Sequence, residues 1–195
     1  PLYTVTAAAD GCDTVSRKIG FKKIELVKAE TSWEERLNYP MSRNTPPITV
    51  RLNSTVIFAK GSNWVCPEIF YGRLTRERYR EQLELVKKAN LNFLRCWGGA
   101  IINKESFFEL CDEMGIMIWQ EFPLACNRYE GTDHYVSVLE SEATAIIDRI
   151  KQHVCLMFWC GGNELFNNWS CMTEQDKPIR LMHTLTYLKT PEIPF

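Results

Sequence analysis

The stretch that decides the fold is Cys155–Glu164, which reads CLMFWCGGNE. Its first six residues are apolar or aromatic and carry no charge, which predicts a strand buried in a sheet. The two glycines that follow allow the backbone to turn sharply. Asn163 and Glu164 therefore come at the carboxyl end of a buried strand, and Glu164 is the best candidate for a catalytic carboxylate.

Upstream of this stretch, the chain alternates short apolar runs with helical patterns from Thr55 onward. The predicted strands are Val56–Ala59, Phe93–Trp97, Ile116–Trp119 and Cys155–Cys160. The predicted helices are Glu77–Asn92, Lys104–Met114 (stopped by Gly115), Val138–His153 and Ile179–Leu188. Four successive strand–helix units with apolar strands predict a parallel sheet covered by helices.

Two parallel architectures compete, an open doubly wound sheet and a (β/α)8 barrel. The sequence contains neither the glycine fingerprint of dinucleotide-binding sheets nor a phosphate-binding loop. Polar and aromatic residues instead follow the strands, in the segments KGSNW (60–64), WGG (97–99), QEF (120–122) and GGNE (161–164). Barrel enzymes place their chemistry at the carboxyl ends of strands, and a whole barrel takes roughly 250 residues. We therefore predict an α/β fold that contains the N-terminal half of a TIM barrel.

The first 30 residues alternate apolar and polar side chains around a turn at Asp10-Gly11. They predict two strands, over Leu2–Thr6 and Ile19–Val27, which form the terminal hairpin of a β-sandwich domain. The prolines at 40, 46 and 47 predict a linker. The predicted division is thus 1–30 (end of the sandwich), 31–54 (linker) and 55–195 (first half of the barrel).

Composition excludes several classes of function. Lysine and arginine number 23 and aspartate and glutamate 24, so the formal net charge of −1 gives no electrostatic footprint for nucleic acid. No apolar stretch approaches the roughly 18 residues of a membrane span. The eight cysteines lack the spacing of zinc ligands, and no cofactor motif is present, so we predict neither a metal nor a cofactor. Cys96, Cys155 and Cys160 fit buried structural thiols.

Each candidate site residue has a functional and a structural interpretation. Glu164, with apolar walls from Trp159 and Trp169, suits a general acid, but it could equally cap the following segment. Glu121, at the end of another strand, could bind substrate hydroxyls or pair with Arg95. Tryptophans at strand ends could stack on a sugar ring or pack in the core; these are Trp64, Trp97, Trp119 and Trp169. No histidine is placed beside Cys126 by a recognisable motif, so we do not predict a thiol nucleophile.

Five segments in this order resemble glycoside hydrolase family 2, most closely its β-mannosidase branch. They are KGSNW (60–64), NFLRCWGG (92–99), LCDEMG (110–115), WQEF (119–122) and WCGGNE (159–164). The resemblance runs from about residue 2 to residue 188. The sequence departs from the β-mannosidase pattern at Ala100, where a third glycine is usual, and at Glu121, where aspartate is usual.

The resemblance implies a retaining exo-β-glycosidase that acts on terminal β-linked sugars of an oligosaccharide or glycoside. In it, Glu164 is the acid/base and Asn163 binds the sugar 2-hydroxyl. Trp97 forms part of the wall of the −1 subsite, and Trp119 and Glu121 lie near it. The family's nucleophile is a second glutamate at the end of barrel strand 7, which four strand–helix units do not reach. We therefore expect this chain to be a fragment with little or no activity.

The alternative function is a non-catalytic carbohydrate-binding or interaction module. A half-barrel also has open edges, which we expect at Val56–Ala59 and Leu156–Cys160, and they favour a homo-oligomer or coverage by the linker. The resemblance favours a periplasmic, secreted or lysosomal protein over a cytoplasmic one, without deciding among them.

Overall fold

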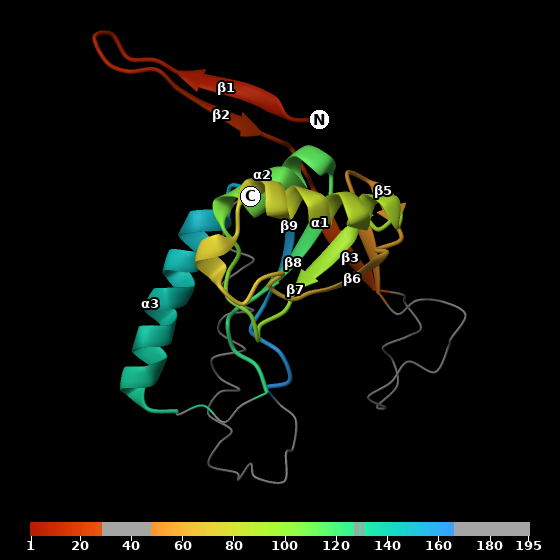
Figure 1. Ribbon diagram of the computed structural model, residues 1–195, viewed down its shortest axis with the longest axis vertical. Helices are drawn as coiled ribbons and strands as arrows, with labels where there is room; N and C mark the ends of the chain where they lie inside the picture. The colour runs from red at the N-terminus through yellow and green to blue at the C-terminus, as the bar shows by residue number, and fades with distance from the viewer. Residues whose placement is uncertain (29–47, 127–128, 130, 166–195) are drawn as a thin grey trace.

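The computed structural model describes residues 1–28, 48–126, 129 and 131–165 (Figure 1). Its strands form three sheets. They are a hairpin of β1 (Tyr3–Ala7) and β2 (Val15–Ile19); an antiparallel sheet of β3 (Ile24–Lys28), β4 (Ile48–Leu52) and β5 (Thr55–Ile57); and a parallel sheet of β6 (Gly61–Trp64), β7 (Phe93–Cys96), β8 (Met117–Glu121) and β9 (Leu156–Cys160). The helices are η1 (Tyr71–Arg73, 3-10), α1 (Arg76–Lys88), α2 (Glu105–Met114) and α3 (Asp133–Ile150).

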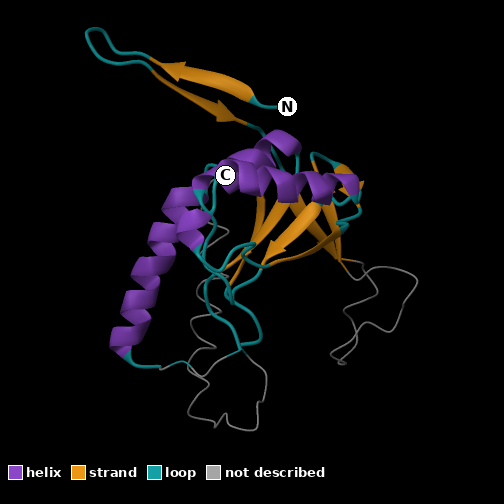
Figure 2. Ribbon diagram, in the orientation of Figure 1, coloured by secondary structure: helices purple, strands orange, loops and turns teal. Residues whose placement is uncertain are grey.

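The parallel sheet runs in the order β6-β7-β8-β9, so each strand lies beside its neighbour in sequence. A doubly wound sheet reverses its direction of winding part-way, whereas a barrel adds every new strand on the same side. Right-handed connections that advance in one direction put their helices on one face of the sheet. Figure 2 shows the helices outside the strands. The strand order therefore settles the choice in favour of a partial barrel.

The two faces of the parallel sheet bury different side chains. Toward the helices, Leu94, Ile118 and Leu156 pack against Phe107 and Ile150, and each of these residues is at most 1% exposed. On the opposite face, a smaller cluster joins the amino ends of the strands to the β3–β5 sheet; its members are Phe93, Met117, Met157, Ile24, Leu52 and Ile57. Because side chains alternate along a strand, residues 95 and 119 continue this second face toward the carboxyl ends.

The three predicted helices within the described residues are confirmed, with shifted ends. The Thr75 hydroxyl accepts the Arg78 N–H to begin α1, and Gly115, with φ of +66°, ends α2. The hydroxyl of Thr132 accepts the Tyr135 N–H, which starts α3 five residues earlier than the apolar pattern indicates. The predicted helix 179–188 lies outside the described residues.

The first barrel strand was misplaced by sequence reasoning. The predicted strand Val56–Ala59 overlaps β5, which pairs antiparallel with β4 and is not part of the parallel sheet. The first parallel strand is β6, whose sequence GSNW has little apolar character because only Trp64 in it is buried. Gly61 is required there, since a β-carbon would lie 2.0 Å from the Phe93 carbonyl oxygen. Within the described residues, the outer strands of the four-stranded sheet are thus β6 and β9.

The predicted N-terminal hairpin is confirmed at its turn and first strand, but its second strand, predicted over Ile19–Val27, is wrong: the partner of β1 is β2, which shares only Ile19 with that range. β1 and β2 pair around Gly11, which has φ of +77°, and the hairpin projects away from the helices (Figure 1). Residues 20–23 belong to no strand, and the next strand, β3, pairs with β4 in a separate sheet. That sheet contains one strand from each of the three predicted segments. The division into 1–30, 31–54 and 55–195 stays a prediction.

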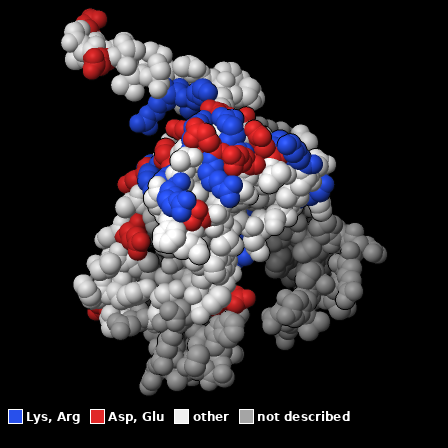
Figure 3. Space-filling model, viewed as in Figure 1, with Lys and Arg blue, Asp and Glu red and all other residues white. Residues whose placement is uncertain are grey.

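A charged network covers the outer face of α1 and α2 (Figure 3). Arg76 of α1 forms ion pairs with Glu109 and Glu113 of α2, and Lys18 of β2 reaches Glu113 at 3.2 Å. These pairs lie at the surface, where each contributes at most about 1 kcal/mol.

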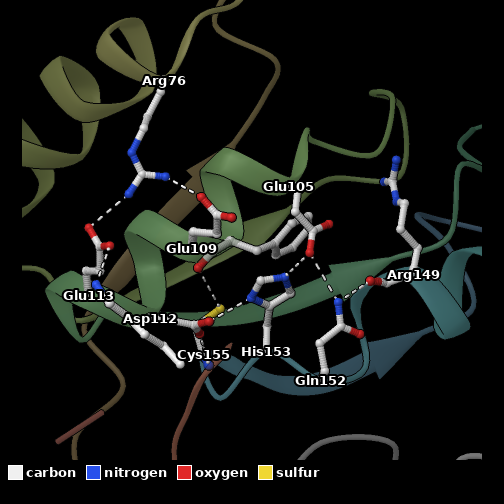
Figure 4. A network of polar contacts seen from close by, with 11 residues as sticks. Arg76, Glu105, Glu109, Asp112, Glu113, Arg149, Gln152, His153 and Cys155 are labelled. Atoms are coloured by element: carbon white, nitrogen blue, oxygen red, sulfur yellow. Dashed lines mark hydrogen bonds and ion pairs between the residues drawn. The ribbon is translucent and has the colours of Figure 1, made fainter. Parts of the chain in front are cut away.

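The same network continues inward to the start of β9 (Figure 4). His153, 6% exposed, contacts Asp112 at 2.6 Å through Nδ1 and Glu105 at 2.8 Å through Nε2. Asp112 also accepts the Cys155 N–H at 2.7 Å. The network therefore fixes β9, the strand that leads to Glu164, against α2.

Candidate active site

Polar side chains at the carboxyl ends of β6 to β9 meet around one guanidinium group, that of Arg95. Arg95 lies on β7, on the face of the sheet opposite the helix-side core. Its Nη2 is 2.6 Å from Glu121 Oε1, and its Nε donates to the same oxygen at 2.8 Å. Arg95 Nη1 also donates to Asn63 Oδ1 on the neighbouring strand β6 at 3.1 Å, and Nη2 donates to Asn163 Oδ1, in the turn after β9, at 2.6 Å. Arg95 thus connects the carboxyl ends of all four strands.

Glu121 is buried, with 1% exposure, and both of its oxygens accept hydrogen bonds. Oε1 faces Arg95, and Oε2 accepts the Gly98 N–H at 2.8 Å. Of the two alternatives that the sequence left open for Glu121, the pairing with Arg95 is present in the structure. Its carboxylate holds the guanidinium and the turn after β7 in place.

Two turns that carry glycine pack closely at this end of the sheet. A β-carbon on Gly98 would lie 2.6 Å from the carbonyl oxygens of Phe122 and Leu124, and one on Gly162 would lie 2.6 Å from that of Leu124. Gly162 also has φ of +149°, a conformation that other residues rarely adopt. The glycines after β7 and β9 therefore allow both turns to approach the segment that follows β8.

Asn163 and Glu164 sit at the end of this tightly packed turn. Asn163 is 9% exposed, its N–H donates to the Leu124 carbonyl at 2.9 Å, and residue 125 forms an isolated parallel bridge with it. Glu164 is exposed, and its backbone has a left-handed conformation, with φ of +54°. The amide is thus held rigidly beside Arg95, while the carboxylate faces solvent.

Cys126 contacts both of these residues. The Asn163 Nδ2 donates to Cys126 Sγ at 2.9 Å, and the Cys126 thiol donates to Glu164 Oε2 at 3.4 Å. Sequence reasoning weighed Cys126 only as a nucleophile and so missed this contact. No local pattern marks it, because the contact joins segments 37 and 38 residues apart.

The predicted tryptophans divide between the site and the core. Trp119 is 37% exposed, and the Arg95 guanidinium lies 5.8 Å from the centre of its ring. Trp97, which follows β7, is half-buried, and its ring lies over Gly99. Trp64 is 8% exposed, packs on Phe107 at 5.0 Å between ring centroids, and is a core residue and not a sugar platform. Trp169 lies outside the described residues.

Across the described residues, no group of three or more histidine, cysteine, aspartate or glutamate side chains is arranged to hold a metal ion. The cysteines there are free thiols, and Cys96, Cys111 and Cys155 are buried. None of the helices in these ranges is both long and apolar enough to cross a membrane.

Known proteins that resemble the chain are β-mannosidases and related glycosidases. The chain is 39% identical over 151 residues to a β-mannosidase of Capra hircus (76% of this chain, 16% of the relative). It is 30% identical over 168 residues to β-mannosidase B of Thermothelomyces thermophilus (84% and 19%). The solved β-D-mannosidase of Dictyoglomus thermophilum superposes with a TM-score of 0.71 at 31% identity, covering 83% of this chain and 19% of that one.

The chain is a β-mannosidase-like region of glycoside hydrolase family 2. No family model matches it. β-Glucuronidase 3 of Bacteroides uniformis, at 21% identity and a TM-score of 0.69, shares the fold over 96% of this chain and 22% of its own. These comparisons confirm the sequence-based family assignment and the partial barrel.

The β-mannosidase-like region spans 16% and 19% of the length of the two curated relatives described above. The sequence alone points to Arg95, the hub of the site, only as a partner of Glu121. The inward alternation of Phe93 and Arg95 on β7 was the signal that could have shown Arg95 facing the other strand ends.

Proposed function

We propose that this region supplies the acid/base glutamate and the sugar-binding amide of a retaining β-mannosidase. Glu164 is the acid/base, and Asn163 binds the sugar 2-hydroxyl. The observation that carries the proposal is the placement of both residues at the end of β9, with the Asn163 amide oxygen 2.6 Å from Arg95 Nη2. That contact turns the amide oxygen away from solvent and leaves its nitrogen to donate. An exposed carboxyl group directly after a fixed amide suits proton transfer to a glycosidic oxygen.

The site is extended by the aromatic side chains on the same side. Trp97 and Trp119 offer ring faces on which the C–H face of a sugar can stack. In this proposal they border the −1 subsite, and Glu121 acts indirectly by holding Arg95. The pairing of both Glu121 oxygens supports this indirect role.

Retaining hydrolysis requires a second carboxylate about 5–5.5 Å from the first, as nucleophile. Glu121 is unsuited to that task because its oxygens are engaged by Arg95 and Gly98. We propose that the nucleophile lies outside this region, so that the region alone does not turn over glycosides.

The test compares this chain with a graft in which it replaces the matching segment of a full-length β-mannosidase. Aryl β-mannoside, β-galactoside, β-glucuronide and β-glucosaminide are offered to both. We expect no turnover by the chain alone, and mannoside turnover by the graft. In the graft, Glu164→Gln should lower kcat/KM, which reports the glycosylation step, by about 10²–10⁴-fold for poor leaving groups, and by less for an activated dinitrophenyl leaving group, which needs no acid in that step.

The matched control is Glu84→Gln, which makes the same change on the exposed side of α1 and should leave kcat unchanged. An equal loss for good and poor leaving groups would contradict the acid role of Glu164. Turnover by the chain alone, abolished in Glu164→Gln, would contradict the external nucleophile.

A carbohydrate-binding module is the second candidate, favoured by the exposure of Trp119 beside Arg95. It predicts glycan binding by the chain alone that is lost in Trp119→Ala and unaffected by Glu164→Gln. Isothermal titration calorimetry with mannobiose distinguishes the two.

A further inference from the structure

The thiol of Cys126 lies between the two residues that the proposed function uses. It accepts the Asn163 Nδ2–H at 2.9 Å and donates to Glu164 Oε2 at 3.4 Å. On its other side, the Asn163 amide accepts from Arg95 Nη2 at 2.6 Å. Arg95, Asn163, Cys126 and Glu164 therefore form one continuous hydrogen-bonded chain.

The backbone holds Cys126 in this place at a conformational cost. Its φ is +46°, a left-handed conformation that residues with a β-carbon rarely adopt. Its N–H donates to the Asn163 carbonyl at 3.0 Å, and the Asn163 N–H donates to the Leu124 carbonyl at 2.9 Å. Two backbone bonds thus join the segment after β8 to the turn after β9, and they bring the thiol to the amide and the carboxylate.

We infer that Cys126 is a positioning residue that fixes the orientation of the Asn163 amide and the direction of the Glu164 carboxylate. A primary amide can flip and exchange its oxygen and nitrogen. Arg95 attracts the oxygen and Cys126 the nitrogen, so only one orientation satisfies both. The nitrogen has two hydrogens, and the one not given to Cys126 is the donor available to a sugar hydroxyl. This inference rests on the proposed function for the identity of that ligand.

The protonation state of the thiol agrees with a donor and not with a nucleophile. Cys126 is exposed, but partial loss of solvation beside its neighbours and the hydrogen bond to Glu164 raise the pKa of its thiol, against the smaller lowering effects of Asn163 and Arg95. Cys126 is therefore protonated at neutral pH and can donate its S–H. The Glu164 carboxylate raises this pKa and the Arg95 charge lowers it, so the titration of the thiol is sensitive to both charged residues.

The first test follows alkylation of Cys126 by iodoacetamide from about pH 6 to 10, in this chain, with mass spectrometry to separate it from the other cysteines. Glu164→Gln removes the negative charge 3.4 Å from the sulfur. The apparent pKa of Cys126 should then fall by about half a unit to one unit. The control Glu84→Gln should leave the profile unchanged. Coincident profiles in native chain and Glu164→Gln would overturn the inference.

The second test follows hydrogen exchange of the Asn163 side-chain amide by NMR. Cys126→Ala removes the acceptor and should speed this exchange by about fivefold, whereas Cys126→Ser keeps a donor and acceptor and should stay within about twofold of native. Equal rates in native, serine and alanine chains would overturn the inference. Neither test requires turnover, so an inactive graft would refute the proposed function while the thiol and amide signals decide this one.

Discussion

Replacement of Glu121 by glutamine should destabilise the fold substantially although it preserves the shape of the side chain. Glu121 is 1% exposed, and its oxygens accept from Arg95 at 2.6 and 2.8 Å and from the Gly98 N–H at 2.8 Å. Glutamine has one carbonyl oxygen and one NH2 group in their place. Whichever way the amide turns, a donor faces a donor, either at the guanidinium or at the buried N–H.

The magnitude follows from these two losses. An orphaned buried N–H costs about 1–3 kcal/mol, and losing one partner of a fully buried ion pair costs about 3–5 kcal/mol. The Arg95 side chain is 26% exposed, so water compensates part of the second loss. We therefore expect the free energy of unfolding to fall by about 2–3 kcal/mol, equivalent to about 4–12 °C in Tm for a chain of this size.

The assay is urea unfolding followed by tryptophan fluorescence and circular dichroism, with coincident transitions as the test of two-state behaviour. The control Glu84→Gln should change stability by less than about 0.5 kcal/mol. Combining Glu121→Gln with Arg95→Met should recover about 1–2 kcal/mol of the summed single losses, because the two side chains act as a pair. A loss below about 0.5 kcal/mol in Glu121→Gln, or strictly additive losses, would refute the reasoning.

Three further changes test the frame around the site. Gly98→Ala places a β-carbon 2.6 Å from two backbone carbonyl oxygens and should cost about 1–3 kcal/mol by urea unfolding; a neutral effect would contradict the close approach. Burial lowers the pKa of His153, but hydrogen bonds and charges of Asp112 and Glu105 outweigh this and raise it, so its stabilisation is complete below about pH 6.5 and falls as pH rises through the higher folded pKa. That decline should disappear in His153→Gln. Burial lowers the pKa of Lys22 to about 8, so stability should rise between about pH 8 and 10.5, and a Lys22→Met chain that keeps the rise would contradict this.

Local sequence patterns predicted most elements because burial is periodic along each element. The apolar runs of β7, β8 and β9 and the helical spacing of α1, α2 and α3 were each visible in a window of a few residues. The strand β6 was missed because it is an edge strand that buries only Trp64, so its sequence lacks that periodicity. The apolar run just before it, Val56–Ala59, overlaps β5, which belongs to another sheet.

Around the site, the sequence placed Asn163 and Glu164 at a strand end through the two glycines before them. It also allowed two roles for Glu121, binding of substrate hydroxyls or pairing with Arg95, without deciding between them. The decision depends on the register of β7 and β8, which sets Arg95 beside Trp119 and brings the guanidinium to the carboxylate 26 residues away. The role of Cys126 depends equally on the bridge between the segments after β8 and β9.

The sequence by itself determined the strand–helix alternation and the glycine turns, because these depend on backbone preference and burial within short segments. It also determined the motifs of family 2, because each motif is a short run of residues. Tertiary structure alone decided the order of the strands, the hub at Arg95 and the thiol bridge from Asn163 to Glu164. Those contacts join residues up to 68 positions apart. These contacts form only when the folded sheet brings residues that are distant in sequence together, so no local pattern of residues encodes them.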